Sequence, residues 1–190
     1  MVSIKQKLGK MRTEWLLEVK EEVTKQLKVG FIKPVNQAEW IDNVVPVLKK
    51  DGMVRMCVDF RGLNKACPKD DFPLPHIDVL EDNTAGSALM SLMDGFLWYN
   101  QIKIASKDMT KITFTTEWGI YCYMVMLFGL KNVGVTYQRM ATTLLHDMMH
   151  NEVEVYVDDM IVKSKDRENH TTNLRKFFER IKEYRLRLNL

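Results

Sequence analysis

The stretch Val153-Glu154-Val155-Tyr156-Val157-Asp158-Asp159-Met160-Ile161-Val162 places two adjacent carboxylates between two apolar runs. Both runs are rich in β-branched residues, which favour strands. Two strands that are separated by two residues form a tight hairpin, and Asp tolerates the backbone angles of such a turn. The pattern therefore predicts a β-hairpin with Asp158 and Asp159 in its turn.

Two neighbouring anionic side chains repel each other, and a cation beside them would offset the repulsion. Carboxylate oxygens are hard ligands of the kind that Mg²⁺ and Mn²⁺ prefer. A solvated surface turn is the alternative, and the dipeptide alone favours it because loops are generally polar. The decision between the two depends on the rest of the chain.

The composition is that of an ordered globular chain. It has 190 residues, 46% of them hydrophobic and 28% charged, which suffices for one substantial core or two small lobes. The formal net charge is +3 and the sequence pI is about 8.7. This balance is compatible with a nucleic-acid partner but falls short of a strongly basic domain.

The cysteines and the hydropathy pattern exclude several classes of protein. Cys57, Cys67 and Cys122 are widely spaced without a C-x-x-C pair, which argues against a disulfide framework and a zinc ribbon and favours a reducing intracellular setting. No apolar run approaches the roughly 20 residues that span a bilayer. No apolar segment follows the basic residues at the start of the chain, so we expect neither a membrane anchor nor a secretory signal.

Periodicity and turn residues predict interleaved helices and strands, hence an α+β class with a mostly antiparallel sheet and helices on one face. The predicted helices are 13–28, 76–82, 136–149 and 173–188. The predicted strands are 44–49 and 53–60 around Asp51-Gly52, a buried run at 88–93, and 111–115 with 120–126. An irregular connection is expected at 67–75.

Two groups of charged residues are candidates for binding metal ions and a triphosphate. Asp94 follows a predicted strand, and if that strand neighbours the Asp158-Asp159 hairpin, the carboxylates converge. Such a cluster suits two Mg²⁺ ions about 4 Å apart, the geometry of in-line phosphoryl displacement. Arg55, with Lys49 and Lys50, lies on the first hairpin on the face opposite the core, where cations can meet a triphosphate. The alternative for these cations is a solvated hairpin edge.

Ordered motifs along nearly the whole chain resemble the reverse transcriptase of gypsy-class long-terminal-repeat retrotransposons, most closely the plant type. The motifs occur in the family's order and spacing. They are Glu39-Trp40 and the stretches 43–47, 55–61, 63–70, 72–78, 93–96, 99–103, 128–132, 136–139 and 156–164.

The resemblance implies the fingers and palm of a right-handed polymerase. Fingers are expected at about 1–69 and 102–132, and palm at about 70–101 and 133–190, with the thumb beyond Leu190. The implied reaction is RNA-directed DNA synthesis, the joining of a deoxynucleoside triphosphate to a primer 3′ end with two Mg²⁺ (or Mn²⁺) ions. The implied partners are an RNA or DNA template with primer, deoxynucleoside triphosphates and the rest of a Pol polyprotein, without a membrane. The family's setting is the cytoplasm, in a virus-like particle, or the nucleus.

The resemblance also assigns roles by position. Asp94, Asp158 and Asp159 match the catalytic, metal-binding carboxylates, and Arg55, helped by Lys50, matches the residue that grips the incoming triphosphate. The remaining roles are the following: Tyr99 excludes a ribose 2′ hydroxyl, Phe128 and Gly129 line the nucleotide pocket, and Gln138 and Tyr156 lie at the template and primer.

Several residues depart from the family pattern. Leu97 and Trp98 replace a Ser-Gly pair where the backbone approaches the triphosphate, Leu127 replaces a Pro, and Val133 and Val135 replace Ala. An indole in place of glycine crowds such a site, and overpacking costs about 1–3 kcal/mol even in a core. The alternative function is therefore a truncated, catalytically inactive retrotransposon remnant that at most binds nucleic acid.

A zinc site is a minor alternative. His146 and His150 are four residues apart on a predicted helix with Asp147 beside them, a spacing that suits one metal ion. No third ligand has recognisable spacing, so a solvated helix face is the favoured interpretation.

Overall fold

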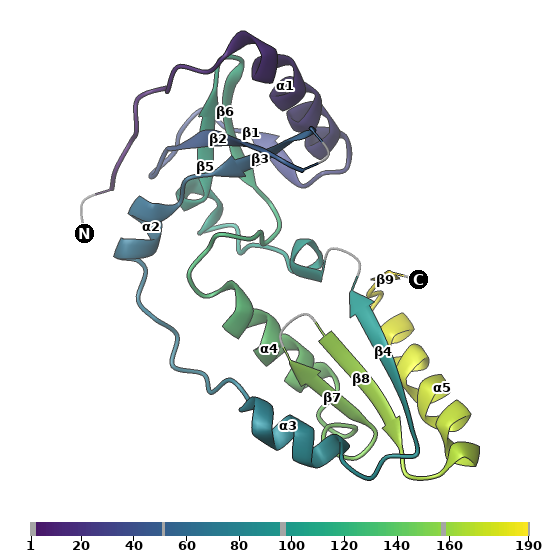
Figure 1. The fold of residues 1–190 in the computed structure, drawn as a ribbon. Coiled ribbons are helices and arrows are strands. Elements are labelled where there is room, and N and C mark those ends of the chain that lie inside the picture. Colours follow the sequence, from purple (N-terminus) through teal and green to yellow (C-terminus); the bar gives the residue numbers. More distant parts are fainter. Residues whose placement is uncertain (1–2, 51, 96–97, 157–158, 190) are drawn as a thin grey trace. The chain divides into compact units, whose positions relative to one another are not determined.

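The computed structural model describes residues 3–50, 52–95, 98–156 and 159–189. The chain forms two compact units, each described by itself below (Figure 1). Unit 1 comprises residues 1–69 and 102–131, and unit 2 comprises residues 70–101 and 132–190. No helix in the described part of the chain is both long and apolar enough to cross a membrane.

Unit 1 is built on a mixed sheet with the strand order β1-β6-β5-β2-β3. Its strands are β1 (Ile32–Pro34), β2 (Asp42–Leu48), β3 (Val54–Val58), β5 (Thr113–Thr116) and β6 (Gly119–Tyr123). Strands β2 and β5 pair in parallel, and the other pairs are antiparallel. Its helices are α1 (Thr13–Lys28), α2 (Arg61–Ala66) and the short 3-10 turn η2 (Met109–Lys111).

The core of unit 1 lies between α1 and the sheet. Val19 and Val23, one helical turn apart, are buried on α1 and belong to the same cluster as Phe60 and Phe114. Along β3 the burial alternates, since Met56 is buried and Arg55 is exposed. The predicted placement of Arg55 on the face opposite the core is confirmed.

Unit 2 contains the antiparallel sheet β7-β8-β4-β9. Its strands are β4 (Leu89–Gly95), β7 (Val153–Tyr156), β8 (Asp159–Ser164) and β9 (Leu188–Asn189). Its helices are α3 (Ile77–Thr84), α4 (Val133–Leu144), α5 (Arg167–Glu183) and the 3-10 turn η1 (Trp98–Gln101).

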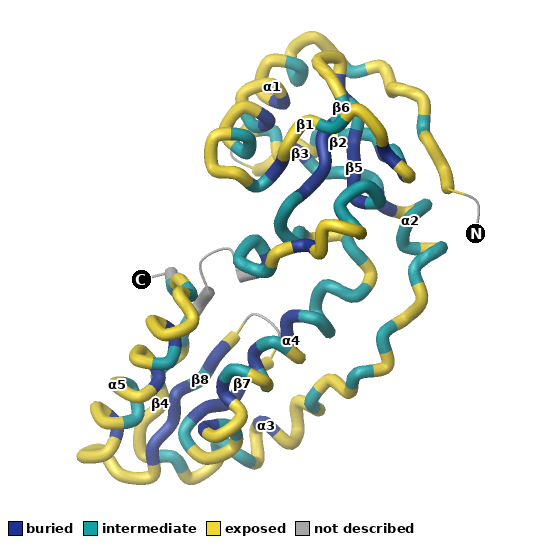
Figure 2. The backbone as a smooth tube through the Cα atoms, turned by 180° about the vertical axis from the view of Figure 1, so that it is seen from behind, coloured by how far each residue is buried: buried dark blue, intermediate teal, exposed yellow. Residues whose placement is uncertain are grey.

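Two helices cover one face of this sheet, as predicted. Val155, Met160 and Val162 are buried there, and Met160 lines a narrow space with residues of α4 and α5 such as Ala141 and Ile181. Figure 2 shows the buried residues running along β7 and β8, with an exposed outer side on α5. Helix α3 contacts the edge strand β7.

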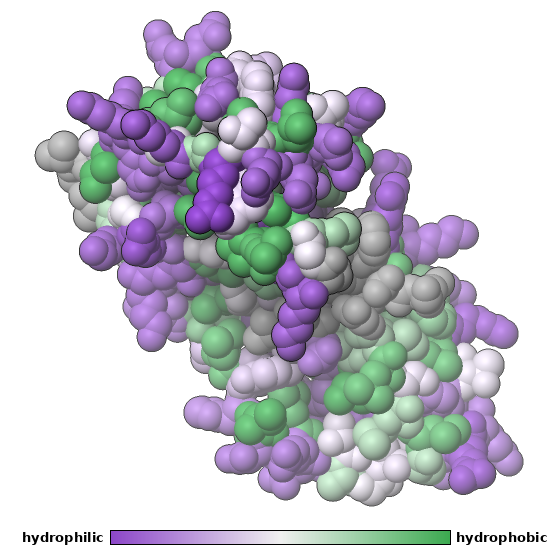
Figure 3. Space-filling model, turned by 45° about the horizontal axis from the view of Figure 1, so that its top comes forward, coloured by the Kyte–Doolittle hydropathy of each residue, from purple (hydrophilic) through white to green (hydrophobic). Residues whose placement is uncertain are grey.

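On the other face, the apolar side chains of β4 are partly open to solvent. Leu92 lies directly opposite Ile161 in the sheet, and the exposed fractions of Leu92 and Met90 are 77% and 49%. The prediction of a buried strand at 88–93 was therefore wrong: Leu89, Met90 and Leu92 are exposed, and Ser91 and Met93 are half-buried. Hydrophobic side chains, green in Figure 3, reach the surface beside hydrophilic ones.

Helix boundaries differ from the prediction where polar side chains decide them. Helix α5 begins at Arg167 instead of 173, and its buried His170 lies 2.8 Å from Ser91 Oγ through Nε2 and 3.0 Å from Ser164 Oγ through Nδ1. These contacts fix the first turns of α5 to β4 and β8. Phe178 on this helix is 40% exposed. Helix α1 matches its predicted bounds.

Candidate functional site

The sheet of unit 2 brings two of the predicted carboxylate positions together. Asp94 in β4 lies directly opposite Asp159 in β8, and Asp159 is exposed. Directly opposite residues of an antiparallel pair have Cβ atoms about 4.5–5.5 Å apart. Residue 158 and the side chain of Asp94 lie outside the described residues. The condition set by the sequence, that the two strands be neighbours, is met.

Strand β8 begins one residue earlier than the sequence predicted. Strand β7 ends at Tyr156 and β8 begins at Asp159, and these two residues pair. Asp159 is thus the first residue of a strand and not part of the turn. The ladder between β8 and β4 reaches this residue, which pairs with Asp94.

The register suits a divalent cation. Like charges directly opposite in a sheet are destabilising, and a bound cation would offset the repulsion of two carboxylates at these positions. Within the described side chains no group of three or more His, Cys, Asp or Glu residues is arranged to hold a metal ion. The carboxylates of residues 94 and 158 are outside that set.

Tyr156 and Gln138 occupy different environments although both were assigned to the template and primer. Tyr156 closes β7 and is 39% exposed. Gln138 on α4 is 1% exposed, and its Nε2 donates to the carbonyl oxygen of Val155 at 3.0 Å. Its amide therefore supports the strand that leads to Tyr156, and little of its surface remains for a template.

Tyr99 is a packed side chain in unit 2. It lies in η1, is 4% exposed, and meets Tyr137 edge to face with ring centroids 5.5 Å apart. A nucleotide would meet only the small exposed part of this ring. Leu97 lies outside the described residues, as does the side chain of Trp98, so the predicted crowding there stays a prediction.

Unit 1 carries the predicted cations on exposed positions. Arg55 pairs with Val47 across the β2–β3 hairpin, and Lys50 lies in its connection. Among the residues that the structure describes, neither side chain forms an ion pair, whereas the neighbouring Arg61 is bound to Asp59 at 2.7 Å. Both Arg55 and Lys50 are exposed to solvent.

The loop after β6 holds Phe128 and Gly129. Phe128 is 68% exposed, and Gly129 has φ +99°, a left-handed conformation that favours glycine. Asn64 fixes this loop from both sides, because its Nδ2 donates to Gly129 O at 2.6 Å and its Oδ1 accepts from Lys131 N at 2.8 Å. Sequence reasoning noted Asn64 only as part of a motif; an Asn directly before Lys65-Ala66 gave no signal of a contact more than 60 residues away.

A second fixed point missed by sequence reasoning lies in unit 2. Arg139 Nη2 contacts both oxygens of Asp70, at 2.6 and 2.8 Å, and its guanidinium lies 4.9 Å from the centre of the Phe72 ring. The hydrogen bond from Arg139 lowers the pKa of Asp70. These motif residues tie the irregular connection before α3 to α4, which is a structural role.

The zinc alternative does not fit the geometry. Helix α4 ends at Leu144, before His146, so the two histidines do not share a helix face. His150 has φ 67°, and its Nδ1 lies 3.1 Å from Glu154 Oε2. The spacing predicted a continuous helix, which the turns after Leu144 interrupt.

Comparisons with known proteins agree with this architecture. The family model described as "Reverse transcriptase (RNA-dependent DNA polymerase)" matches residues 47–190. The chain is 30% identical over 177 residues to the retrovirus-related Pol polyprotein from transposon opus of Drosophila melanogaster, covering 91% of this chain and 18% of that protein. It is 28% identical over 184 residues to the Tf2-3 polyprotein of Schizosaccharomyces pombe, covering 95% of this chain and 13% of that protein.

Solved structures share the fold. The protease-reverse transcriptase of prototype foamy virus matches with a TM-score of 0.86 at 22% identity, over 99% of this chain and 25% of that one. A foamy viral protease-reverse transcriptase in complex with RNA/DNA hybrid matches with a TM-score of 0.85 at 21% identity, over 97% of this chain and 24% of that one. The α+β polymerase fold is thereby confirmed. The chain spans less than a fifth of the length of the curated relatives that it matches. It belongs to the reverse transcriptase (RNA-dependent DNA polymerase) family of retrotransposon Pol polyproteins.

Proposed function

We propose that this chain is the fingers and palm region of an RNA-directed DNA polymerase from a gypsy-class retrotransposon of the plant type. Unit 1 corresponds to the fingers and unit 2 to the palm; the unit boundaries at 69/70, 101/102 and 131/132 support these names. The observation that carries the proposal is the register that sets Asp94 opposite Asp159. The plant-type gypsy assignment is supported by the ordered motifs of the sequence.

Asp94, Asp158 and Asp159 would hold two divalent cations in this proposal. Bound Mg²⁺ would lower the pKa of the primer 3′ hydroxyl and neutralise charge on the departing pyrophosphate. The chain's own residues position the reactants. The strand ladder holds positions 94 and 159 opposite each other, and Arg55 with Lys50 binds phosphate oxygens through charge-assisted hydrogen bonds.

The partners follow from the same chemistry. The substrates are deoxynucleoside triphosphates and a primer annealed to an RNA or DNA template; an RNA/DNA hybrid and double-stranded DNA are bound in the foamy viral structures. Phe128 is exposed beside the left-handed Gly129, and in this proposal its ring contacts a base or sugar. Tyr99 presents its remaining exposed edge to the sugar, and Gln138 acts through β7.

Primer extension on poly(rA)/oligo(dT) with Mg²⁺ tests the proposal. We expect DNA synthesis from a polypeptide that carries this chain with a thumb, and a loss of about a thousandfold or more in Asp158→Asn, since a metal-binding carboxylate supplies several kcal/mol of transition-state stabilisation. The matched control is Asp71→Asn, which removes an exposed carboxylate elsewhere in unit 2 and should leave synthesis unchanged. Synthesis that survives Asp158→Asn would contradict the two-metal mechanism.

The inactive remnant is the second candidate, favoured by Leu97 and Trp98. A displacement near 1 Å beside a reacting triphosphate costs roughly a hundredfold in rate. We expect Leu97→Ser with Trp98→Gly to raise nucleotide incorporation in the thumb-bearing polypeptide by about ten- to a hundredfold. An unchanged rate would show that these residues do not limit catalysis, and template binding without synthesis in either variant would favour the remnant.

A further inference from the structure

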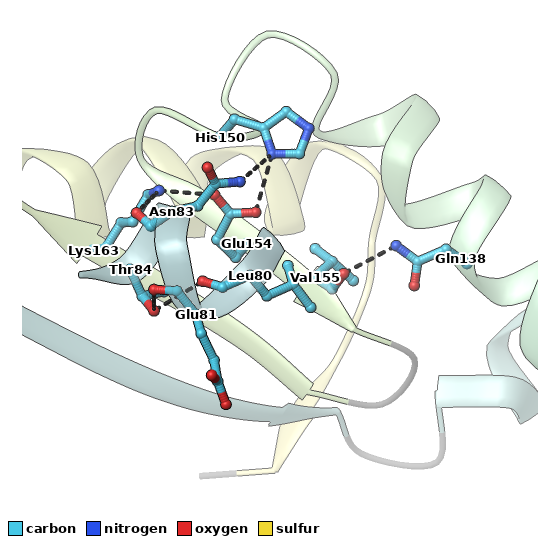
Figure 4. Close-up of polar contacts among 9 residues, drawn as sticks. All are labelled: Leu80, Glu81, Asn83, Thr84, Gln138, His150, Glu154, Val155 and Lys163. Atoms are coloured by element: carbon cyan, nitrogen blue, oxygen red, sulfur yellow. Dashed lines mark hydrogen bonds and ion pairs between the residues drawn. The ribbon is translucent and has the colours of Figure 1, made fainter. Parts of the chain in front are cut away.

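A buried ion pair lies inside the hairpin that carries Asp159. Lys163 Nζ on β8 is 2.8 Å from Glu154 Oε1 on β7, and the side chains are 5% and 1% exposed (Figure 4). Glu154 lies opposite Ile161, so the pair runs diagonally across the two strands. It joins the strands on either side of the turn, a few residues from Tyr156 and Asp159.

Neighbouring elements complete the polar contacts of this pair. Lys163 Nζ also donates to the carbonyl oxygen of Asn83 in α3 at 2.6 Å. The second carboxylate oxygen of Glu154 lies 3.1 Å from His150 Nδ1, and Asn83 Nδ2 lies 3.2 Å from the same nitrogen. Figure 4 shows the His150 ring closing the group from one side, while Glu81 of α3 points away from it. With the proton on Nδ1, His150 donates to Glu154 Oε2, so both oxygens of the buried carboxylate are satisfied, and Nδ1 then does not accept from Asn83 Nδ2.

A buried ion pair of this kind is not expected to add to the folding stability of the chain. Desolvating two charges costs several kcal/mol per ion, and a well-packed neutral replacement is often neutral or stabilising. Removing one partner is different, because it leaves an uncompensated buried charge. What the pair supplies is a fixed geometry, since charge and hydrogen bonds hold Glu154 and Lys163 in one arrangement.

The fixed geometry acts on a strand that has a partner on one side only. β7 is the edge of the sheet, so every second carbonyl group along it points away from β8. Gln138 covers the carbonyl of Val155 on that outer side. The Lys163–Glu154 pair joins the side chains of β8 and β7. On β7, the Gln138 contact at Val155 and the ion pair at Glu154 lie within two residues of Tyr156, the pairing partner of Asp159.

We propose that Lys163 and Glu154, closed by His150 and Asn83, are positioning residues that hold the Asp159 hairpin in the arrangement that binds a divalent cation. This inference rests on the proposed metal site at Asp94 and Asp159. The pair acts through the hairpin and does not touch the cation. Loss of one charge releases β7, and cation binding weakens even though the carboxylate ligands are intact.

The test uses Mn²⁺ alone as probe on the 190-residue chain. Its binding is measured by electron paramagnetic resonance, with Asp159→Asn defining the background, and amide hydrogen exchange reports order in β7 and β8. The variants are Lys163→Met, the neutral pair Glu154→Gln/Lys163→Met, and His150→Ala. The matched control is Glu152→Gln/Lys176→Met, which removes the exposed ion pair of 2.7 Å next to the same strands.

We expect Lys163→Met to weaken Mn²⁺ binding about tenfold and to accelerate exchange in the hairpin, the size seen when outer contacts of metal sites are removed. The neutral pair should recover the folding stability lost in Lys163→Met but not the Mn²⁺ affinity, because it lacks the contact that fixes the geometry, whereas the surface control should change the affinity less than twofold. If Lys163→Met does not fold, His150→Ala, on a half-exposed side chain, should show the same changes at about threefold.

Two results would overturn the proposal in distinguishable ways. Folded variants that bind Mn²⁺ like the unaltered chain would make the pair merely structural. An unaltered chain that binds no more Mn²⁺ than Asp159→Asn would overturn the metal site itself. In that case, faster amide exchange in Lys163→Met would show that the ion pair orders the hairpin but has no role in cation binding.

Discussion

Asp42 at the start of β2 is a fully buried carboxyl group in unit 1. Its Oδ1 accepts a hydrogen bond from Gln6 Nε2 at 3.0 Å, and its Oδ2 is buried without a hydrogen-bond partner among the described residues. Burial, with a smaller contribution from Asp59, raises the pKa of Asp42 from 3.8 to about 6. The group therefore opposes folding once it is ionised.

The sign of the pH dependence follows from this raised pKa. Between pH 3.8 and about 6 the folded chain retains a proton that the unfolded chain releases, so the free energy of unfolding falls as pH rises through this window. Asp42→Asn should remove this loss and stabilise the chain at pH 7 by about 1–3 kcal/mol. Urea unfolding at pH 4, 5, 6 and 7 measures the free energy of unfolding of Asp42→Asn and of the unaltered chain. Asp71→Asn, at an exposed carboxylate, is the control. A difference in this free energy between Asp42→Asn and the unaltered chain that does not vary with pH would contradict the raised pKa of Asp42.

Individual residues were the level at which sequence reasoning was least complete. The alternation along 54–60 placed Arg55 on the open face, because period-two burial is a local property. Burial of Gln138 and Tyr99 depends on partners that arrive from other elements, Val155 and Tyr137, and no local pattern encodes those. Polar motif residues were therefore assigned to ligands when part of their role is internal.

The loop at 128–131 depends on one side chain from another element, α2. Asn64 both donates to and accepts from this loop, and Gly129 keeps a left-handed φ there. Each hydrogen bond contributes about 1 kcal/mol, so Asn64→Ala should lower the free energy of unfolding by about 1–2 kcal/mol and speed amide exchange at Lys131.

Asn64→Asp is the matched variant for this prediction. It keeps the oxygen that accepts from Lys131 N and loses the amide that donates to Gly129 O. Exchange at Lys131 should then stay slow, while stability falls at least as much as in Asn64→Ala, because a carboxylate oxygen would face the Gly129 carbonyl oxygen. Equal exchange rates in Asn64→Ala and the unaltered chain would contradict the assigned contact.

Helices and hairpins were predicted well where their signals are local. The bounds of α1 follow from apolar spacing and the following Gly30, and the β2–β3 hairpin follows from Asp51-Gly52. Helix α5 begins earlier than expected, and His170 in its first turns binds serines of two strands. Helix α4 ends earlier, at Leu144, whose carbonyl oxygen accepts from Arg180 Nη1 of α5 at 2.6 Å. Side chains from distant elements contact these ends.

At the scale of the whole molecule, the decisive contact joins segments far apart in sequence. β4 and β8 pair over the full length from Leu89 with Ser164 to Asp94 with Asp159. Loop closure over such distances leaves no periodic trace in either strand, so the sequence predicted the strands and left their adjacency as a condition. The same holds for the parallel pairing of β2 with β5 in unit 1, where no hairpin links the strands.

Cation binding at this pairing should be visible in the stability of the whole chain. A ligand that binds the folded state alone raises the free energy of unfolding by RT ln(1 + [L]/Kd), about 2.7 kcal/mol at a hundredfold excess over Kd. We expect 10 mM Mg²⁺ to raise the Tm of the unaltered chain by several degrees. Asp159→Asn should show a smaller shift, and the same ionic strength from KCl should give none; equal shifts in Mg²⁺ and KCl would indicate screening alone.

The exposed apolar side chains on the sheet of unit 2 affect self-association of the chain in solution. The side chains of Leu92, which is 77% exposed, and Met90 form a hydrophobic surface that is open to solvent. Such surfaces adhere to one another as concentration rises. Light scattering should therefore reveal growing particles in concentrated samples, and Leu92→Ser, which alters a largely exposed side chain, should reduce that growth.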